Sequence, residues 1–216
     1  MRAGAVLGFA LAAGLALGVS AAAPPAGGAL LPVEEHDSPD ARLLAETHAE
    51  ELVRLHADVL RCHPGMAIHR HGIGFRKPRR GPNPAPALTL WVWLDPAQPP
   101  RGADLAARAG DAFRRQGAAL FRRLIGRSPV FADPRVDGYG VVLTWLSPVQ
   151  RGRRLVGESL AVFADKLAAA NFVHETISSA VFLSRAQVRA FDGETELERP
   201  QLRLSDDEAP AGDWSC

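Results

Sequence analysis

The chain has 216 residues, of which 47% are apolar and 23% are charged, and its formal net charge is +1. This composition is typical of one globular domain and excludes a collagen-like or intrinsically disordered chain. Charges of opposite sign are segregated, because residues 70–154 hold 16 basic and 5 acidic side chains whereas residues 34–69 and 192–216 are acidic. We expect these blocks to pair within the protein, and we do not expect nucleic acid as a partner.

Residues 1–22 have the pattern of a secretory signal peptide. Arg2 precedes an uncharged stretch with an apolar centre at residues 6–19, and small residues fill positions 20–23. The apolar centre is shorter than the roughly 20 residues of a membrane-spanning helix, and the small residues are typical of a cleavage site. We therefore expect a periplasmic or secreted protein without a transmembrane anchor after cleavage, and a flexible linker over residues 23–39.

The first expected helix covers residues 40–62, where apolar residues recur three and four positions apart. Pro64 ends it, because proline disfavours helical geometry in the residue before it. Two cysteines in an oxidising compartment favour a disulfide, so we predict a bridge between Cys62 and Cys216. Such a bridge would tie down an acidic tail over residues 206–216. Free or intermolecular thiols are the alternative.

Two strands are expected next, at residues 66–75 and 87–94, because apolar side chains alternate there. The segment between them is rich in proline, so it cannot join a ladder and is expected to be an exposed loop. It carries four cations that are candidate contacts for an anionic envelope surface. They are Arg76, Lys77, Arg79 and Arg80.

The second half of the chain continues to alternate between helical and strand patterns. The expected elements are a helix over residues 102–125, a short strand at 130–131, strands at 139–146 and 155–163, two short helices within 165–186, and a hairpin about Asp192 and Gly193. This order predicts an α+β fold in a single domain over residues 40–205. We expect two layers, a mostly antiparallel sheet with helices on one face.

Three histidines are the candidate metal ligands. His69 and His71 are two residues apart on an expected strand, so their rings would leave the same face about 6 to 7 Å apart. Imidazole suits copper and zinc, and His63 across the bend could supply a third ligand. No established spacing such as HExxH is present. Packed or solvated histidines are therefore the alternative to a metal site.

The sequence carries no recognisable catalytic constellation. Gly157-Glu158-Ser159 lacks the second glycine of a nucleophile elbow. Cys62 and His63 are sequence neighbours, and the side chains of neighbours usually point apart. We therefore predict a non-enzymatic exported binding or accessory protein without a cofactor, whose partner is an unknown envelope protein or an anionic surface. The alternatives are a periplasmic copper- or zinc-binding protein that uses the His69 strand, and a hydrolase of unrecognised type.

Overall fold

A six-stranded sheet is the centre of the computed structural model, which describes residues 28–78, 88–126, 129–147, 156–198 and 200–204. The strands lie side by side in chain order. They are β1 (Ala67–Arg76), β2 (Thr89–Asp95), β3 (Gly138–Leu146), β4 (Gly157–Asp165), β5 (Gln187–Phe191) and β6 (Glu196–Glu198). All neighbouring pairs are antiparallel except β2 and β3, which are parallel because a helical crossover connects them.

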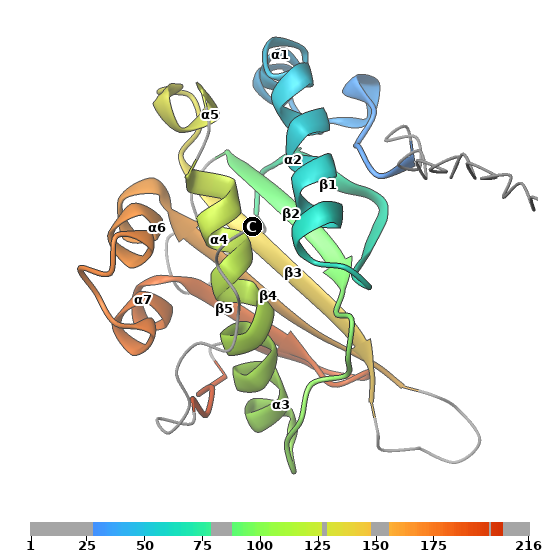
Figure 1. Cartoon of the computed structure of the whole chain (residues 1–216), viewed down its shortest axis with the longest axis vertical. Coiled ribbons are helices and arrows are strands. Elements are labelled where there is room, and N and C mark those ends of the chain that lie inside the picture. Colours follow the sequence, from blue (N-terminus) through green and yellow to red (C-terminus); the bar gives the residue numbers. More distant parts are fainter. Residues whose placement is uncertain (1–27, 79–87, 127–128, 148–155, 199, 205–216) are drawn as a thin grey trace, which may run out of the picture.

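Helices cover one face of this sheet (Figure 1). The longer ones are α1 (Pro39–Thr47), α2 (Ala49–Cys62), α3 (Leu105–Ala112), α4 (Ala118–Ile125), α6 (Lys166–Val173) and α7 (Ser179–Arg185). A π-helical turn, η3 (Phe113–Gly117), joins α3 to α4 in one helical rod, while α5 (Pro129–Ala132) and the 3₁₀ helix η2 (Val33–Glu35) are single turns. The predicted α+β fold, with a mostly antiparallel sheet and helices on one face, is therefore confirmed. None of the described helices has the length and apolar character needed to cross a membrane.

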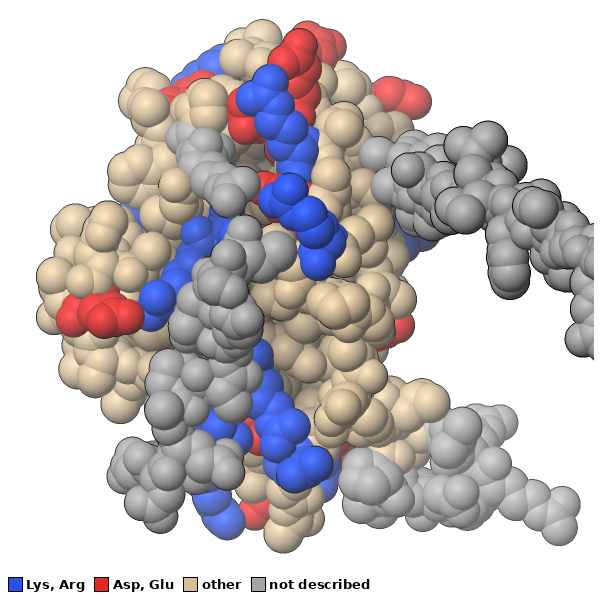
Figure 2. Space-filling view, viewed as in Figure 1, with Lys and Arg blue, Asp and Glu red and all other residues tan. Residues whose placement is uncertain are grey.

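Charged side chains on the helix-covered face pair mostly with near neighbours. Figure 2 shows basic side chains running along this face, with acidic side chains gathered beside some of them. On α2, Arg54 pairs with Glu50 and Glu51, and Arg61 pairs with Asp58. The acidic block at residues 34–69 is thus partly neutralised within its own helix rather than by the basic block alone.

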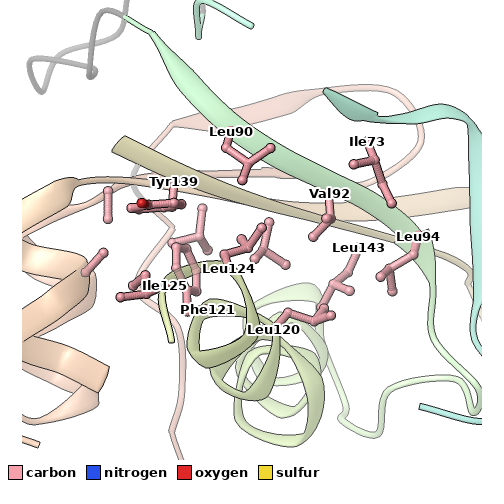
Figure 3. Close-up of a cluster of buried hydrophobic side chains, with 14 of the residues drawn as sticks. Ile73, Leu90, Val92, Leu94, Leu120, Phe121, Leu124, Ile125, Tyr139 and Leu143 are labelled. Atoms are coloured by element: carbon pink, nitrogen blue, oxygen red, sulfur yellow. The ribbon is translucent and has the colours of Figure 1, made fainter. Parts of the chain in front are cut away.

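The core lies between the sheet and the helical rod (Figure 3). Leu90, Val92 and Leu94 alternate along β2 and are buried on the helix-covered face. They meet the apolar stripe of α4, which includes Leu120 and Leu124, both at most 1% exposed. Because side chains alternate along β2, the residues between these three point to the other face of the sheet.

Two local features differ from the sequence-based expectations. The helix expected at residues 40–62 is divided at His48 into α1 and α2. The strand expected at residues 130–131 is wrong, since these residues form the helical turn α5. Proline fits the first turn of a helix and cannot donate to a ladder, and Pro129 begins this turn.

Part of the segment expected as a linker packs against the domain. Leu31 donates its backbone N–H to the carbonyl of Ile73 over 2.8 Å, and Ile73 donates to Ala29 over 3.0 Å. The buried ring of His36 accepts a hydrogen bond from the backbone N–H of Phe75 at 3.3 Å. Residues 29–36 therefore belong to the folded domain. The expected signal peptide at residues 1–22 and the expected acidic tail at 206–216 lie outside the described residues.

Candidate functional site

The helix-free face of the sheet carries an unbroken row of rings. Trp91 and Trp93 lie on this face, because the residues that alternate with them are in the core. The imidazole of His69 stacks on Trp93 with ring centroids 4.2 Å apart, and the two indoles are 6.0 Å apart. The guanidinium of Arg76 lies 4.7 Å from the centroid of Trp91, within the range of a cation–π interaction. The row therefore ends in a cation.

A groove with a volume of about 430 Å³ begins at this cation. Its lining combines basic, acidic and aromatic side chains from both ends of the described chain. They are Arg76, Lys77 and Arg189, the carboxylates Asp37 and Glu196, and the rings of Trp91 and Phe163. Arg189 donates to Glu196 at 2.9 Å. Arg76 and Lys77 are exposed, so they are the cations of the groove that a solvent-borne anion meets first.

The floor of the groove depends on a close approach between two strands. Gly140 of β3 pairs with Phe163 of β4. A Cβ atom at Gly140 would lie 2.5 Å from a ring carbon of Phe163, which is too close for an unshifted side chain. The missing side chain thus allows the phenyl ring to lie over β3 and to form the apolar part of the groove.

One donor at the groove wall has no acceptor within the described ranges. Trp91 is 8% exposed, and its indole N–H is buried without a hydrogen-bond partner there. Trp93 differs, because its indole N–H donates to the hydroxyl of Thr144 at 2.7 Å. An unsatisfied buried donor is destabilising unless a ligand or water supplies the acceptor.

The structure brings two of the four predicted anion contacts to this groove. Arg76 and Lys77 line it, at the point where the described part of the basic loop begins. Arg79 and Arg80 lie outside the described residues. The tryptophans, Phe163 and Arg189 were not predicted as site residues. The alternation in the strand expected at residues 87–94 was the signal that could have found the two tryptophans, because it puts Trp91 and Trp93 on one face.

His69 and His71 have separate carboxylate partners rather than a common one. The Nε2 atom of His69 lies 2.7 Å from Asp95, and the Nδ1 atom of His71 lies 2.9 Å from Glu35. The pairing of β1 with β2 is irregular in this stretch, and His71 has a φ of 56°, so simple alternation does not hold.

His63 lies apart from that pair, at the end of α2. Its Nε2 atom is buried and has no hydrogen-bond partner within the described part of the chain. Burial, and to a lesser degree the charge of Arg123, lower the pKa of His63. No set of three or more His, Cys, Asp or Glu side chains in the described ranges is arranged to hold a metal ion.

The remaining predicted candidates are separated in the fold. Ser159 lies inside β4, not at a strand-to-helix turn where a nucleophile elbow would place it. Cys62 is the last residue of α2 and the only cysteine of the described part, which therefore contains no pair of cysteines at disulfide distance. Its predicted partner, Cys216, lies outside that part.

A partly buried cluster of one acid and several bases near α5 was missed by sequence reasoning. Asp133 lies 2.9 Å from Nε2 of His48 and 2.7 Å from a guanidinium nitrogen of Arg135. The hydrogen bond from the Arg135 side chain holds the pKa of Asp133 well below its usual range, and the bond to His48 adds to this effect. The ammonium of Lys166 donates to the Asp133 carbonyl at 2.7 Å. This cluster fixes α1, α5 and α6 to one another.

A second buried ion pair lies between α3 and β4. The guanidinium of Arg108 donates to both carboxylate oxygens of Glu158, at 2.6 and 2.8 Å. Trp145 and Ser147 donate to the same carboxylate at 2.9 and 2.7 Å. Burial alone would raise the pKa of Glu158, but these donors outweigh it and hold the pKa below its ordinary value. The hydrogen bonds of these four side chains are thus made within the group. This arrangement is typical of a structural contact rather than of a reactive site.

Comparison of the chain with protein-family models, with curated proteins and with solved structures finds no match.

Proposed function

We propose that the protein is an exported, non-enzymatic binding or accessory protein that holds an anionic ligand in the groove on the helix-free face of the sheet. One observation carries this proposal. The exposed cations Arg76 and Lys77, which begin the basic loop, lie at the same groove as Trp91, Phe163 and Arg189. A cation-rich groove with an apolar floor suits a ligand that presents phosphate or carboxylate groups on a less polar body.

The orphaned indole N–H of Trp91 supports the same assignment. An anionic ligand is rich in hydrogen-bond acceptors, so it could satisfy a donor that has no acceptor among the described residues. The carboxylates Asp37 and Glu196 restrict the choice of ligand, because they repel anions that fill the whole groove. We therefore infer a ligand that places its negative charge beside Arg76 and Lys77 and its apolar part beside Phe163.

The test measures binding of two anionic probes to the full-length protein. One probe is a vesicle that contains an anionic phospholipid, and the other is a short acidic oligosaccharide. Each exposed cation contributes about 1 kcal/mol to attraction by an anionic surface, so Arg76→Gln/Lys77→Gln is expected to weaken binding by about tenfold or more. Which probe binds identifies the source of the anionic groups.

The matched control removes two arginines from the other face. Arg54 and Arg61 on α2 are similarly exposed but already paired with acids. Arg54→Gln/Arg61→Gln is expected to leave binding unchanged, although it changes the net charge by the same amount. Equal losses of binding in the two double variants would mean that net charge, not the groove, attracts the probe. If the wild-type protein binds neither probe, the proposal of an anionic ligand is wrong.

A further inference from the structure

A second groove, also of about 430 Å³, lies between α2 and α4 on the helix-covered face. Its floor is apolar and is formed by Leu52 and Leu55 of α2, Leu124 of α4, Leu90 and Val130. Its rim is charged on both sides. The α2 side carries two ion pairs, Arg54 with Glu51 and Arg61 with Asp58, and the α4 side carries Arg123. Figure 2 shows basic side chains along this face of the molecule. The groove therefore suits a segment that combines an apolar side chain with acidic ones.

Cys62 lies on the face of α2 that lines this groove. It is four residues after Asp58 and seven after Leu55, and both of these line the groove. Residues with these spacings share one face of a helix. Arg61, next to Cys62 in the sequence, and Arg123 of α4 line the same groove, so α4 lies close to this end of α2. A segment in the groove would thus have its end beside the Cys62 side chain.

The arginine on the α4 side of the rim is available for an incoming anion. Arg123 forms no ion pair with any residue that the structure describes, whereas Arg54 and Arg61 pair with acids of their own helix. Residues 205–216 contain four acidic side chains and no basic one. Their charge is therefore complementary to this side of the groove.

The described chain leaves the domain at a place from which the groove can be reached. Leu204 packs on the core, and Arg203 donates its backbone N–H to the carbonyl of Ala106 in α3 at 3.3 Å. The helical rod rises from residue 106 to residue 124 over about 27 Å, at 1.5 Å per residue. Cys216 is the twelfth residue after Leu204, and an extended chain of that length spans about 40 Å.

We infer that residues 205–216 run along the helical rod and dock in the groove between α2 and α4. In this arrangement Trp214 covers the apolar floor, an acidic side chain pairs with Arg123, and Cys216 forms a disulfide with Cys62. The occupant of the groove is therefore a segment of the protein itself. This inference is independent of the ligand proposed for the opposite face of the sheet.

The covalent step is a thiol–disulfide exchange. The thiolate of Cys216 or Cys62 attacks an oxidised dithiol, such as a disulfide oxidoreductase of an exported compartment, and forms a mixed disulfide. The second cysteine then displaces the oxidant, which leaves as a dithiol with the two electrons and two protons lost by the protein. The new bond joins the Sγ atoms of Cys62 and Cys216.

The first experiment maps the cysteines in the full chain refolded in a glutathione redox buffer. Free thiols are blocked with an alkylating agent before proteolysis without a reductant. The expected result is one linked peptide that contains Cys62 and Cys216 from the same chain. Alkylation of both cysteines, or a linkage between two chains, would overturn the inference.

The second experiment separates docking from the disulfide alone. A docked segment holds Cys216 beside Cys62 and raises its effective concentration, which the glutathione ratio at half-oxidation measures. Trp214→Ser and Arg123→Glu are each expected to lower that effective concentration by about tenfold, because each removes one contact of the docked segment. Lys77→Glu reverses a charge on the opposite face and is expected to have no effect.

Two outcomes of the second experiment would contradict docking. Equal effective concentrations in the wild type, Trp214→Ser and Arg123→Glu would mean that residues 205–216 are held only by the bridge. An effect of Lys77→Glu as large as that of Arg123→Glu would mean that net charge, not the groove, brings the cysteines together. Far-ultraviolet circular dichroism of each variant shows whether it folds before the comparison is made.

Discussion

Glu158 is a buried carboxylate whose negative charge is met by one guanidinium and two further donors. Its side chain and that of Arg108 are 4% and 5% exposed. A buried pair contributes little relative to an apolar pair of the same shape, but loss of one partner leaves the other charge without compensation. Stability should therefore depend strongly on retaining both members of the pair.

Glu158→Ala is expected to lower the free energy of unfolding by about 3–5 kcal/mol, because Arg108 remains buried without its carboxylate. Urea denaturation measures the change. Glu50→Ala is the matched control, since Glu50 also pairs with an arginine but its side chain is 87% exposed. A surface change of this kind is expected to cost no more than about 0.5 kcal/mol. Similar losses of unfolding free energy in both variants would mean that the buried ion pair stabilises the protein no more than an exposed one.

Asp133 makes stability depend on acid pH in a defined direction. The pKa of Asp133 is lowered in the folded protein, chiefly by Arg135. A lowered folded-state pKa gives a contribution that is complete above the unfolded pKa, near about 3.9, and is lost as the pH falls toward the folded value. Asp133→Asn is therefore expected to destabilise the protein at pH 7. The stability difference from wild type should shrink steadily below about pH 4.

The measurement for Asp133 is urea denaturation of both proteins between pH 7 and pH 2.5. A difference that stays constant over this range would assign the effect of the substitution to packing rather than to charge.

The long-range partners of these buried charged residues could not be predicted from the sequence, because they are distant along the chain. Asp104 and Arg108 have the spacing of a favourable helix pair, yet Asp104 instead accepts from the backbone N–H of Ala107 and Arg108 binds Glu158. Local spacing is visible in a sequence. A partner 50 positions away is set by the packing of α3 against β4, and no local pattern encodes that contact.

At the scale of elements, Gly140 tests how two strands form the floor of the groove on the helix-free face. Gly140→Ala places a Cβ atom 2.5 Å from the ring of Phe163 and 3.3 Å from the side chain of Thr89. We expect a loss of about 1–3 kcal/mol in the free energy of unfolding, because the ring must move. Gly157→Ala is the control in the neighbouring strand, since nothing lies within 4 Å of its added Cβ. Equal effects would assign the loss to glycine in a strand in general.

Periodicity predicted most of the elements but not their relations. Alternating apolar residues located β2 and β3, and a three-and-four spacing located α2 and the helical rod. The groove on the helix-free face could not be predicted, because its lining comes from strands distant in the sequence and from Asp37 in a segment expected to be a linker. The break in β1 near His71 was also invisible, and with it the separate partners of His69 and His71.

At the scale of the whole molecule, charge segregation along the chain does not become a simple pairing of acidic ends with a basic middle. Arg54 and Arg61 are neutralised on α2 itself, and Arg115 pairs with Asp111 four residues away. Arg76 and Lys77 are left exposed at one groove, and the half-buried Arg123 lies at the rim of the other, without an ion pair to any residue that the structure describes. The two proposed binding surfaces therefore lie on opposite faces. Each offers a cation that forms no ion pair within a helix.

Export is the expectation on which the oxidised state of Cys62 and Cys216 depends. When the chain is expressed with residues 1–22 in a bacterium that has a general secretion pathway, we expect the mature protein in the periplasm, beginning at Ala22 or Ala23. Intact mass after fractionation measures the start of the chain and the thiol state together. Leu11→Arg/Leu15→Arg interrupts the apolar centre, so this variant is expected to stay in the cytosol, uncleaved and with reduced thiols. Wild-type protein that is uncleaved and cytosolic would contradict export, and the bridge would then need another oxidising environment.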